Sequence, residues 1–239
     1  MPRYAKRRRL PKLKKLTDVS LANFQWSWAT VPSAQTTLRV IVERRAAENR
    51  RLEPLRAALR QAGASESQLA KASFSDDGTL DLHLTGLPIS DLSFLKGLPV
   101  KKLDIKQTKV PDLSALCGAP LIWLAAHECP IRDLTPLAGC SALFSLGLAQ
   151  TPVSDLRPVL GCPLLVLHIQ GSTALRDVAA LPSCFILEHL VLPRNVSGVE
   201  ALRTLPRIQR ISFEWDARAS QVAHTAAEFW AEFDRNRTP

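Results

Sequence analysis

Residues 100–120, VKKLDIKQTKVPDLSALCGAP, and residues 121–141, LIWLAAHECPIRDLTPLAGCS, are two copies of one unit and decide the fold. Each copy begins with apolar residues spaced around a central leucine, and each continues into the pattern Asp-Leu-x-x-Leu. The central leucines, Leu103 and Leu124, are 21 residues apart. Self-similarity at a short fixed period is typical of a solenoid, in which every copy packs on the next one.

The same unit recurs from residue 80 to residue 216. Successive central residues are separated by 21, 21, 22, 21, 23 and 21 positions. These residues are Leu82, Leu103, Leu124, Leu146, Leu167, Leu190 and Ile211. A single short strand cannot bury its apolar face alone, whereas parallel strands stacked about 4.8 Å apart bury a continuous column of leucines. We therefore expect one parallel sheet with one strand from each copy.

The pattern Leu-x-x-Leu-x-Leu resembles the leucine-rich repeat, in a short form without a long helix on its convex side. The resemblance implies an α/β leucine-rich-repeat solenoid with a parallel concave sheet, turns or 3-10 segments on the convex side, and helical caps at both ends. Over residues 50–236 the chain also resembles the leucine-rich-repeat regions of bacterial serine/threonine-kinase-like proteins of planctomycete and verrucomicrobial type. This second likeness is carried by LRAALRQAG…FSDDGTLDLHL near the start and RISFEWD…TAAEFWAEFD near the end.

Those kinase-like proteins carry a kinase domain, whereas this sequence contains no Gly-rich phosphate loop and no HRD or DFG motif. In kinases these motifs hold the nucleotide, the magnesium ions and the catalytic base. The resemblance therefore implies the repeat module alone, as a kinase-associated scaffold. We expect no enzymatic activity and no cofactor.

Both ends of the repeat array have sequences that predict caps, because a stacked leucine core is exposed at its ends. Residues 50–79 place leucines at helical spacing, and the Asp-Asp-Gly at 76–78 predicts a hairpin with an edge strand. Residues 217–239 contain the capping-box pair Thr225 and Glu228, which predicts a helix. The aromatic residues that follow are Phe229, Trp230 and Phe233. Docking on the last strand is favoured for them, and binding of a partner is the alternative.

Three polar positions recur in the turns between strands, and each has a favoured interpretation. The aspartates are expected to cap backbone N–H groups of their own turns rather than form a calcium ladder. Small side chains at the usual asparagine position are expected to bond buried backbone groups. Cysteines before the strands are expected to be buried thiols rather than zinc ligands. The aspartates are Asp91, Asp112, Asp133, Asp155 and Asp177. The residues at the asparagine position are Thr108, Cys129, Thr151, Ser172 and Asn195. The cysteines before the strands are Cys140, Cys162 and Cys184.

Residues that alternate with the buried leucines form three columns on the concave face, where a rigid sheet presents side chains to a partner. The centre of this face is small and apolar beside Trp123, and its edges are charged. An apolar centre with a polar rim and a large aromatic side chain suits a protein or peptide partner. The expected partner-binding residues are Lys102, Asp104, Trp123, His127, Val166, His168, His189 and Val191.

Four histidines lie in these columns, but their strand positions predict neither a metal site nor an acid–base site. His168 and His189 are diagonal neighbours, whereas His83 and His127 are separated from them by one or more strands about 4.8 Å apart. Three imidazoles cannot meet a zinc ion at about 2.1 Å from such positions. We therefore expect solvated surface histidines, no metal site and no catalytic triad.

The positive charge of the chain belongs to one short segment. The 239 residues carry a formal charge of +9, and residues 1–16 hold eight basic residues and no acidic one. The other residues comprise 23 basic and 22 acidic side chains, so they are nearly neutral. This arm is either a disordered solubilising extension or a segment that binds nucleic acid or an anionic membrane surface. Its expected anion contacts are Arg7, Arg8, Arg9, Lys12, Lys14 and Lys15.

Residues 17–49 are the least informative part of the sequence. The alternation of Phe24, Trp26 and Trp28 is compatible with a strand, and residues 36–51 predict a helix. No apolar run is long enough to span a membrane. The five cysteines are an odd number without a CxxC pair, which favours reduced thiols in the cytoplasm. We expect a monomer.

Overall fold

The computed structural model of the chain describes residues 32–75 and 77–236. The chain divides into two compact units, residues 1–47 and residues 48–239. Helix α1, Pro32–Gln61, begins in the first unit and ends in the second. In the first unit its exposed Arg39 Nε donates to Glu43 Oε1 at 2.8 Å. The basic arm and the aromatic alternation of the N-terminal extension lie outside the described residues.

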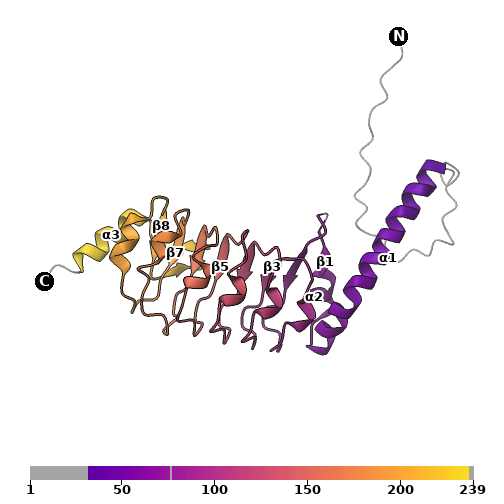
Figure 1. Cartoon of the computed structure of the whole chain (residues 1–239), viewed down its shortest axis with the longest axis horizontal. Helices are drawn as coiled ribbons and strands as arrows, with labels where there is room; N and C mark the ends of the chain where they lie inside the picture. The colour runs from indigo at the N-terminus through magenta and orange to yellow at the C-terminus, as the bar shows by residue number, and fades with distance from the viewer. Residues whose placement is uncertain (1–31, 76, 237–239) are drawn as a thin grey trace, which may run out of the picture. The chain divides into compact units, whose positions relative to one another are not determined.

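The second unit is a solenoid whose strands lie side by side in chain order (Figure 1). Its sheet has eight strands, of which β1 is antiparallel to β2 and the others run parallel. The strands are β1 Ser73–Phe74, β2 Leu80–His83, β3 Val100–Asp104, β4 Trp123–Ala125, β5 Ser145–Gly147, β6 Val166–His168, β7 His189–Val191 and β8 Arg210–Ser212. The central leucines are register partners, as Leu103 with Leu124 and Leu124 with Leu146. The predicted leucine-rich-repeat solenoid is confirmed.

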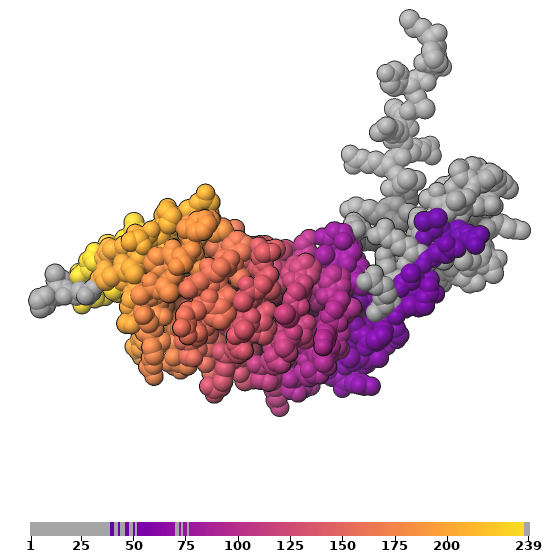
Figure 2. Space-filling model, in the orientation of Figure 1, coloured from indigo at the N-terminus to yellow at the C-terminus, as the bar shows by residue number. Residues whose placement is uncertain are grey.

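The core lies between this sheet and a row of short 3-10 helices on the convex side. Leu103 and Ile105 of one repeat, and Leu116 of its 3-10 helix, are all fully buried. The 3-10 helices are η2 Ser93–Leu95, η3 Ser114–Leu116, η4 Thr135–Leu137, η5 Arg157–Val159, η6 Leu181–Ser183 and η7 Val199–Thr204. Figure 2 shows successive parts of the solenoid as adjoining bands of colour, which is how a stack of nearest neighbours packs.

Five of the convex turns are each closed by an aspartate, so the capping interpretation is confirmed for these five residues, whereas the turn before η7 has Gly198 instead. Asp112 Oδ1 accepts the backbone N–H of Ser114 at 2.8 Å, and Asp133 Oδ1 accepts that of Thr135 at 2.8 Å. The equivalent bonds in the other repeats are made by Asp91, Asp155 and Asp177. The Ser114 hydroxyl, and then its backbone N–H, lower the pKa of Asp112 below its ordinary value.

Small polar side chains pair between neighbouring repeats at the usual asparagine position. Thr151 Oγ1 donates to the Leu148 carbonyl at 2.7 Å, and Ser172 Oγ of the next repeat donates to the same carbonyl at 2.9 Å. The equivalent group in the preceding repeats comprises Thr108, Cys129 and the carbonyl of Ile105. These four buried side chains satisfy carbonyl groups that strand pairing leaves free, as the sequence predicts, whereas Asn195 at the equivalent position is exposed.

The N-terminal end of the leucine core is covered by the second half of α1 and by helix α2, Glu66–Lys71. Leu52, Leu55 and Leu59 of α1 are buried. The two helical segments predicted from the sequence lie in this one helix, since α1 continues through both. Strand β1 pairs with β2 through Phe74 and Leu80, as the hairpin pattern predicts.

The C-terminal end is covered by the hairpin β9 Trp215–Asp216 and β10 Gln221–Val222, followed by helix α3, Ala226–Arg235. The capping box is present, because Thr225 N donates to Glu228 Oε2 at 2.8 Å and Glu228 N donates to Thr225 Oγ1 at 3.3 Å. Phe229 is buried, with its ring centroid 5.2 Å from that of Phe213 next to β8. The helix therefore docks its aromatic face on the last repeat, as favoured above. The hairpin was not predicted.

Candidate functional site

The concave face is built from the outward residues of the strands, in the columns that alternation predicts. Lys102, Trp123, Ser145, Val166 and His189 are consecutive register partners along the first column. Lys102 is exposed, and the others are half-buried. The middle column is more buried than expected, since its members Asp104 and Val191 are only 6% and 1% exposed.

Several charged side chains of this face form ion pairs with one another. Lys102 Nζ lies 3.2 Å from Asp81 Oδ2, and Lys106 Nζ lies 3.1 Å from Asp104 Oδ2. At the other end Arg210 Nε donates to the Val222 carbonyl at 2.8 Å. The ion pair at the end of β8 joins Arg194 to Glu214. These ion pairs lie toward the two ends of the face, and the strand residues of its centre, from β4 to β6, include no acidic or basic side chain that is charged at pH 7.

Gly147 on β5 leaves room for the side chain of His127 on the neighbouring repeat. A Cβ atom at Gly147 would lie 2.6 Å from both Cε1 and Nε2 of His127, so the ring lies directly over the glycine. His127 Nδ1 accepts the backbone N–H of Ala149 at 3.0 Å. Because Nδ1 accepts this hydrogen bond, the neutral ring carries its proton on Nε2.

Because the His127 ring extends across Gly147 of β5, it contacts His168 on β6, two strands from β4. Their ring centroids are 4.9 Å apart in an edge-to-face arrangement, and Trp215 of the C-terminal hairpin stacks on His168 at 5.2 Å. The expectation that intervening strands keep His127 away from His168 is therefore wrong. Only a glycine between them lets the rings meet.

Burial gives these two histidines an environment unlike that of surface histidines. Burial, and then the neighbouring His168 and Lys106, lower the pKa of His127 to about 4. Burial also lowers the pKa of His168. Both imidazoles are consequently neutral at pH 7. The expectation of solvated surface histidines is corrected at these two positions.

The C-terminal hairpin also limits the accessible part of the concave face. Arg210 Nη2 donates to the Ala223 carbonyl at 3.3 Å, which fastens the end of the hairpin segment to β8. Val191, which the sequence places among the partner-binding residues, is 1% exposed. Its side chain is thus not available to a partner, whereas Trp215 is 37% exposed. Trp215 was missed because repeat periodicity does not reach the hairpin.

These observations define the concave patch, which is carried by β4, β5, β6 and the hairpin. Its strand β5 contributes only small residues, which leaves the larger side chains of β4 and β6 on either side. The concave patch comprises Trp123, His127, Ala149, Val166, His168 and Trp215. Among the other residues singled out in the sequence, Lys102, Asp104 and His189 lie outside it on the same face.

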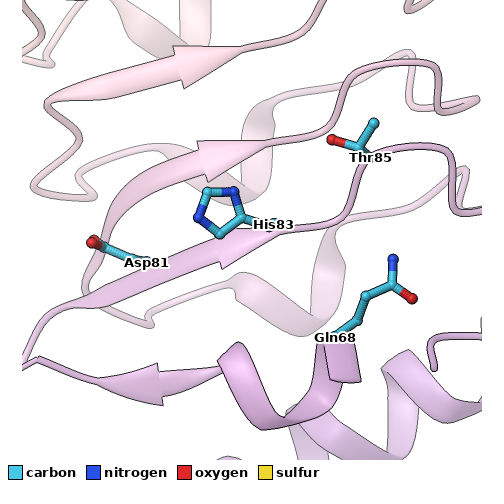
Figure 3. A pocket seen from close by; sticks show the side chains of 4 residues that line it. All are labelled: Gln68, Asp81, His83 and Thr85. Carbon is cyan, nitrogen blue, oxygen red and sulfur yellow. The ribbon is translucent and has the colours of Figure 1, made fainter. Parts of the chain in front are cut away.

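A hollow of ≈ 490 Å³ lies at the N-terminal end of the concave face (Figure 3). Gln68 reaches it from α2, and Asp81, His83 and Thr85 reach it from β2 and the segment that follows. All four side chains are polar, and Asp81 is paired with a lysine of β3. This hollow therefore provides a polar end to the face, distinct from the apolar and aromatic patch.

A second hollow of ≈ 460 Å³, beside α3, contains serine, histidine and glutamate in a row. Ser212 Oγ lies 2.9 Å from His224 Nδ1, and His224 Nε2 lies 4.0 Å from Glu232 Oε2. Ser212 is only 1% exposed, and its oxygen also accepts the backbone N–H of Glu214 at 3.0 Å. A nucleophile must be accessible to its substrate, so this row fastens the C-terminal cap to β8 rather than forming a catalytic triad.

The recurring cysteines are structural in the described residues. Cys140, Cys162 and Cys184 are buried, and burial raises the pKa of the Cys184 thiol to about 11. Across residues 32–75 and 77–236, no three His, Cys, Asp or Glu side chains are arranged to hold a metal ion. Among the helices in that same part of the chain, none has the length and apolar character required to cross a membrane.

Comparison with known proteins supports the fold. No protein-family model and no curated protein matches the chain. Among solved structures, internalin C2 of Listeria monocytogenes is similar at 26% sequence identity and a TM-score of 0.52, over 62% of this chain. The match spans 65% of the internalin C2 chain. A second internalin of that organism matches 57% of this chain and 48% of its own at 17% identity, with a TM-score of 0.46.

Proposed function

We propose that this protein is a non-enzymatic interaction module that binds a protein or peptide partner on the concave patch. The observation that supports this most strongly is the cluster of half-buried aromatic, imidazole and aliphatic side chains on a rigid sheet. Trp123, Val166 and Trp215 offer large apolar area, which is typical of the energetic centre of an interface. The patch itself contains no charged side chain, so an uncharged partner segment fits it.

The test is affinity capture from a cell extract with purified wild-type and variant chains, followed by reconstitution with the purified partner. Val166→Glu places a charge at the centre of the concave patch, and Trp123→Ala removes its large aromatic anchor. Both variants are expected to lose the partner while keeping the wild-type circular dichroism spectrum. Phe185→Ala is the matched control, because Phe185 is 68% exposed and lies outside the strands. A partner that both concave variants retain would refute the proposal.

The basic arm supports a second candidate function, binding of nucleic acid or an anionic surface. Its support is the concentration of eight basic residues in residues 1–16. Phosphate contacts release counterions, so binding of a 20-nucleotide RNA should weaken steeply with added salt and vanish when residues 1–16 are deleted. Equal RNA binding by the full-length and truncated chains would exclude this role.

The resemblance to kinase-like proteins leads us to propose a bacterial setting in which the module accompanies a separate kinase. We further propose a reducing compartment, the cytoplasm, where the chain is a monomer. In support, all five cysteines are free thiols and four are buried. Copurification of a kinase in the capture experiment, and a mass measurement in solution, would test these points.

A further inference from the structure

The residue four positions after the central leucine adopts a left-handed backbone in five consecutive repeats. In chain order these residues are Gly86, Gln107, Glu128, Gln150 and Gly171, with φ of 71°, 57°, 59°, 57° and 71°. Glycine adopts this conformation freely, whereas a residue with a Cβ atom is destabilised by it. Gly86 in the first repeat and Gly171 in the fifth show that glycine can form this turn.

Three adjacent repeats nevertheless keep long polar side chains at this position. Gln107, Glu128 and Gln150, which we call the polar rim, are all exposed. The contact between their side chains is a long one, with Gln107 Nε2 3.3 Å from both carboxylate oxygens of Glu128. This weak contact between rim side chains does not compensate for the strain of their left-handed backbone. Strain retained in this way is typical of functional positions.

The polar rim borders the concave patch. Glu128 follows His127 directly, and Gln150 follows Ala149 directly. Backbone bonding continues past the strands here, because Glu128 N donates to the Ala149 carbonyl and Gln150 N donates to the Gln170 carbonyl, at 2.8 and 2.7 Å. The rim is therefore held in register with the patch, at about 4.8 Å from one repeat to the next.

The chemistry of the rim matches that of a peptide backbone. Each glutamine carboxamide supplies N–H donors and a carbonyl oxygen that accepts hydrogen bonds, and the Glu128 carboxylate supplies acceptor oxygens only. A peptide group offers one donor and one acceptor, and the two repeat spacings of the rim, about 9.6 Å, equal about three residue steps of an extended chain. The neighbouring charges of Lys106 and Asp104 already neutralise each other. The concave patch itself includes no charged side chain, because His127 and His168 are neutral at pH 7, so its surface suits uncharged side chains.

We propose that the polar rim hydrogen-bonds the main chain of an extended segment of the partner, whose uncharged side chains lie on the concave patch. This inference rests on the proposed function and adds the chemical class of the ligand. The rim residues determine affinity through main-chain recognition, while the patch selects apolar or aromatic side chains. Their left-handed backbone is kept because glycine could not make these contacts.

The experiment uses peptides selected from a displayed random 12-residue library on the full chain, with binding measured by fluorescence polarisation. The rim variant is Gln107→Gly with Gln150→Gly, which relieves backbone strain. Its melting temperature should equal or exceed that of the wild type, while its affinity for the selected peptide falls at least tenfold. Ser220→Gly is the matched control, because Ser220 has φ of 50° and lies in the β9–β10 turn. It should gain stability without losing affinity.

Methylation of single peptide amide nitrogens then tests main-chain recognition directly. At one or more positions it should weaken wild-type binding about tenfold and leave binding by the rim variant unchanged. If Val166→Glu abolishes binding but the rim variant binds like the wild type, the rim inference fails and the proposed function stands. If Val166→Glu has no effect, the proposed concave patch fails as well. A library that yields no peptide overturns the extended-peptide ligand.

Discussion

At the scale of single residues, His127 makes the stability of the fold depend on pH. An unfolded histidine titrates near 6.5, whereas burial beside His168 lowers the pKa of His127 to about 4. Protons therefore bind the unfolded chain more tightly, so stability is complete above pH 6.5 and falls as the pH drops from 6.5 to 4. The difference in pKa corresponds to a loss of about 3 kcal/mol over that window.

Urea unfolding at pH 7 and at pH 4.5 measures this effect. The variant His127→Gln should lose much less stability between the two pH values than the wild type. His168, whose pKa is also lowered, leaves a residual dependence of the same sign. The turn aspartates, whose pKa values are lowered, add a small loss of the same sign, but variant and wild type share it, so the difference between them reports His127. Equal pH dependence of variant and wild type would contradict this account of His127.

The contact between His127 and His168 shows where sequence reasoning ends. Alternation along each strand correctly placed both residues on the concave face. It could not show that Gly147 opens a path across β5, because that depends on a side-chain rotamer and on the size of a residue in another repeat. The same limit applies to Val191, which is 1% exposed on β7, because strand β10 of the hairpin, which lies outside the repeats, packs near β7.

At the scale of elements, the paired hydroxyl groups join neighbouring repeats. Thr151 and Ser172 both donate to the Leu148 carbonyl and are almost fully buried. Thr151→Val should destabilise the chain by about 1 kcal/mol, because one buried hydrogen bond is lost. Combined with Ser172→Ala, the loss should exceed the sum of the single effects, since the shared carbonyl then loses both donors.

Urea denaturation of the single and double variants gives these free energies of unfolding. Thr204→Val is the matched control, because Thr204 Oγ1 makes a similar bond to the Ala201 carbonyl at 2.7 Å but is exposed. Water replaces that bond, so the control should change stability much less. Strictly additive losses at Thr151 and Ser172 would show that the two repeats are not coupled through this carbonyl.

Elements also differ in how well the sequence predicts them. The strands, the aspartate-capped turns and the α3 capping box were predicted because each has a local pattern repeated or supported by a neighbour. The hairpin β9–β10 has two-residue strands and lacks an Asn-Gly or Asp-Gly turn, so no local signal marks it. Its stability comes from contacts with the last repeats, such as the Arg210 bond to Val222, which only the folded chain reveals.

At the scale of the whole solenoid, stability is approximately a sum over repeats, because most contacts join neighbouring repeats and few, such as that of His127 with His168, reach farther. A defect in one cap should therefore loosen the nearest repeats and spare the distant ones. Phe229 is the buried anchor of α3, with its ring against Phe213. Phe229→Ala should cost about 3–5 kcal/mol locally, as for other buried phenylalanines.

Amide hydrogen exchange followed by mass spectrometry resolves this effect along the chain. In Phe229→Ala, exchange should accelerate in β7, β8 and the hairpin, and remain at the wild-type rate in β2 to β4. Because Trp215 stacks on His168, the loosened hairpin should also expose one side of the concave patch and weaken partner binding. Phe185→Ala, at an exposed aromatic position, controls for loss of a ring without loss of packing. Uniform acceleration from β2 to β8 would mean that the solenoid unfolds as one cooperative body, and the nearest-neighbour description would then fail.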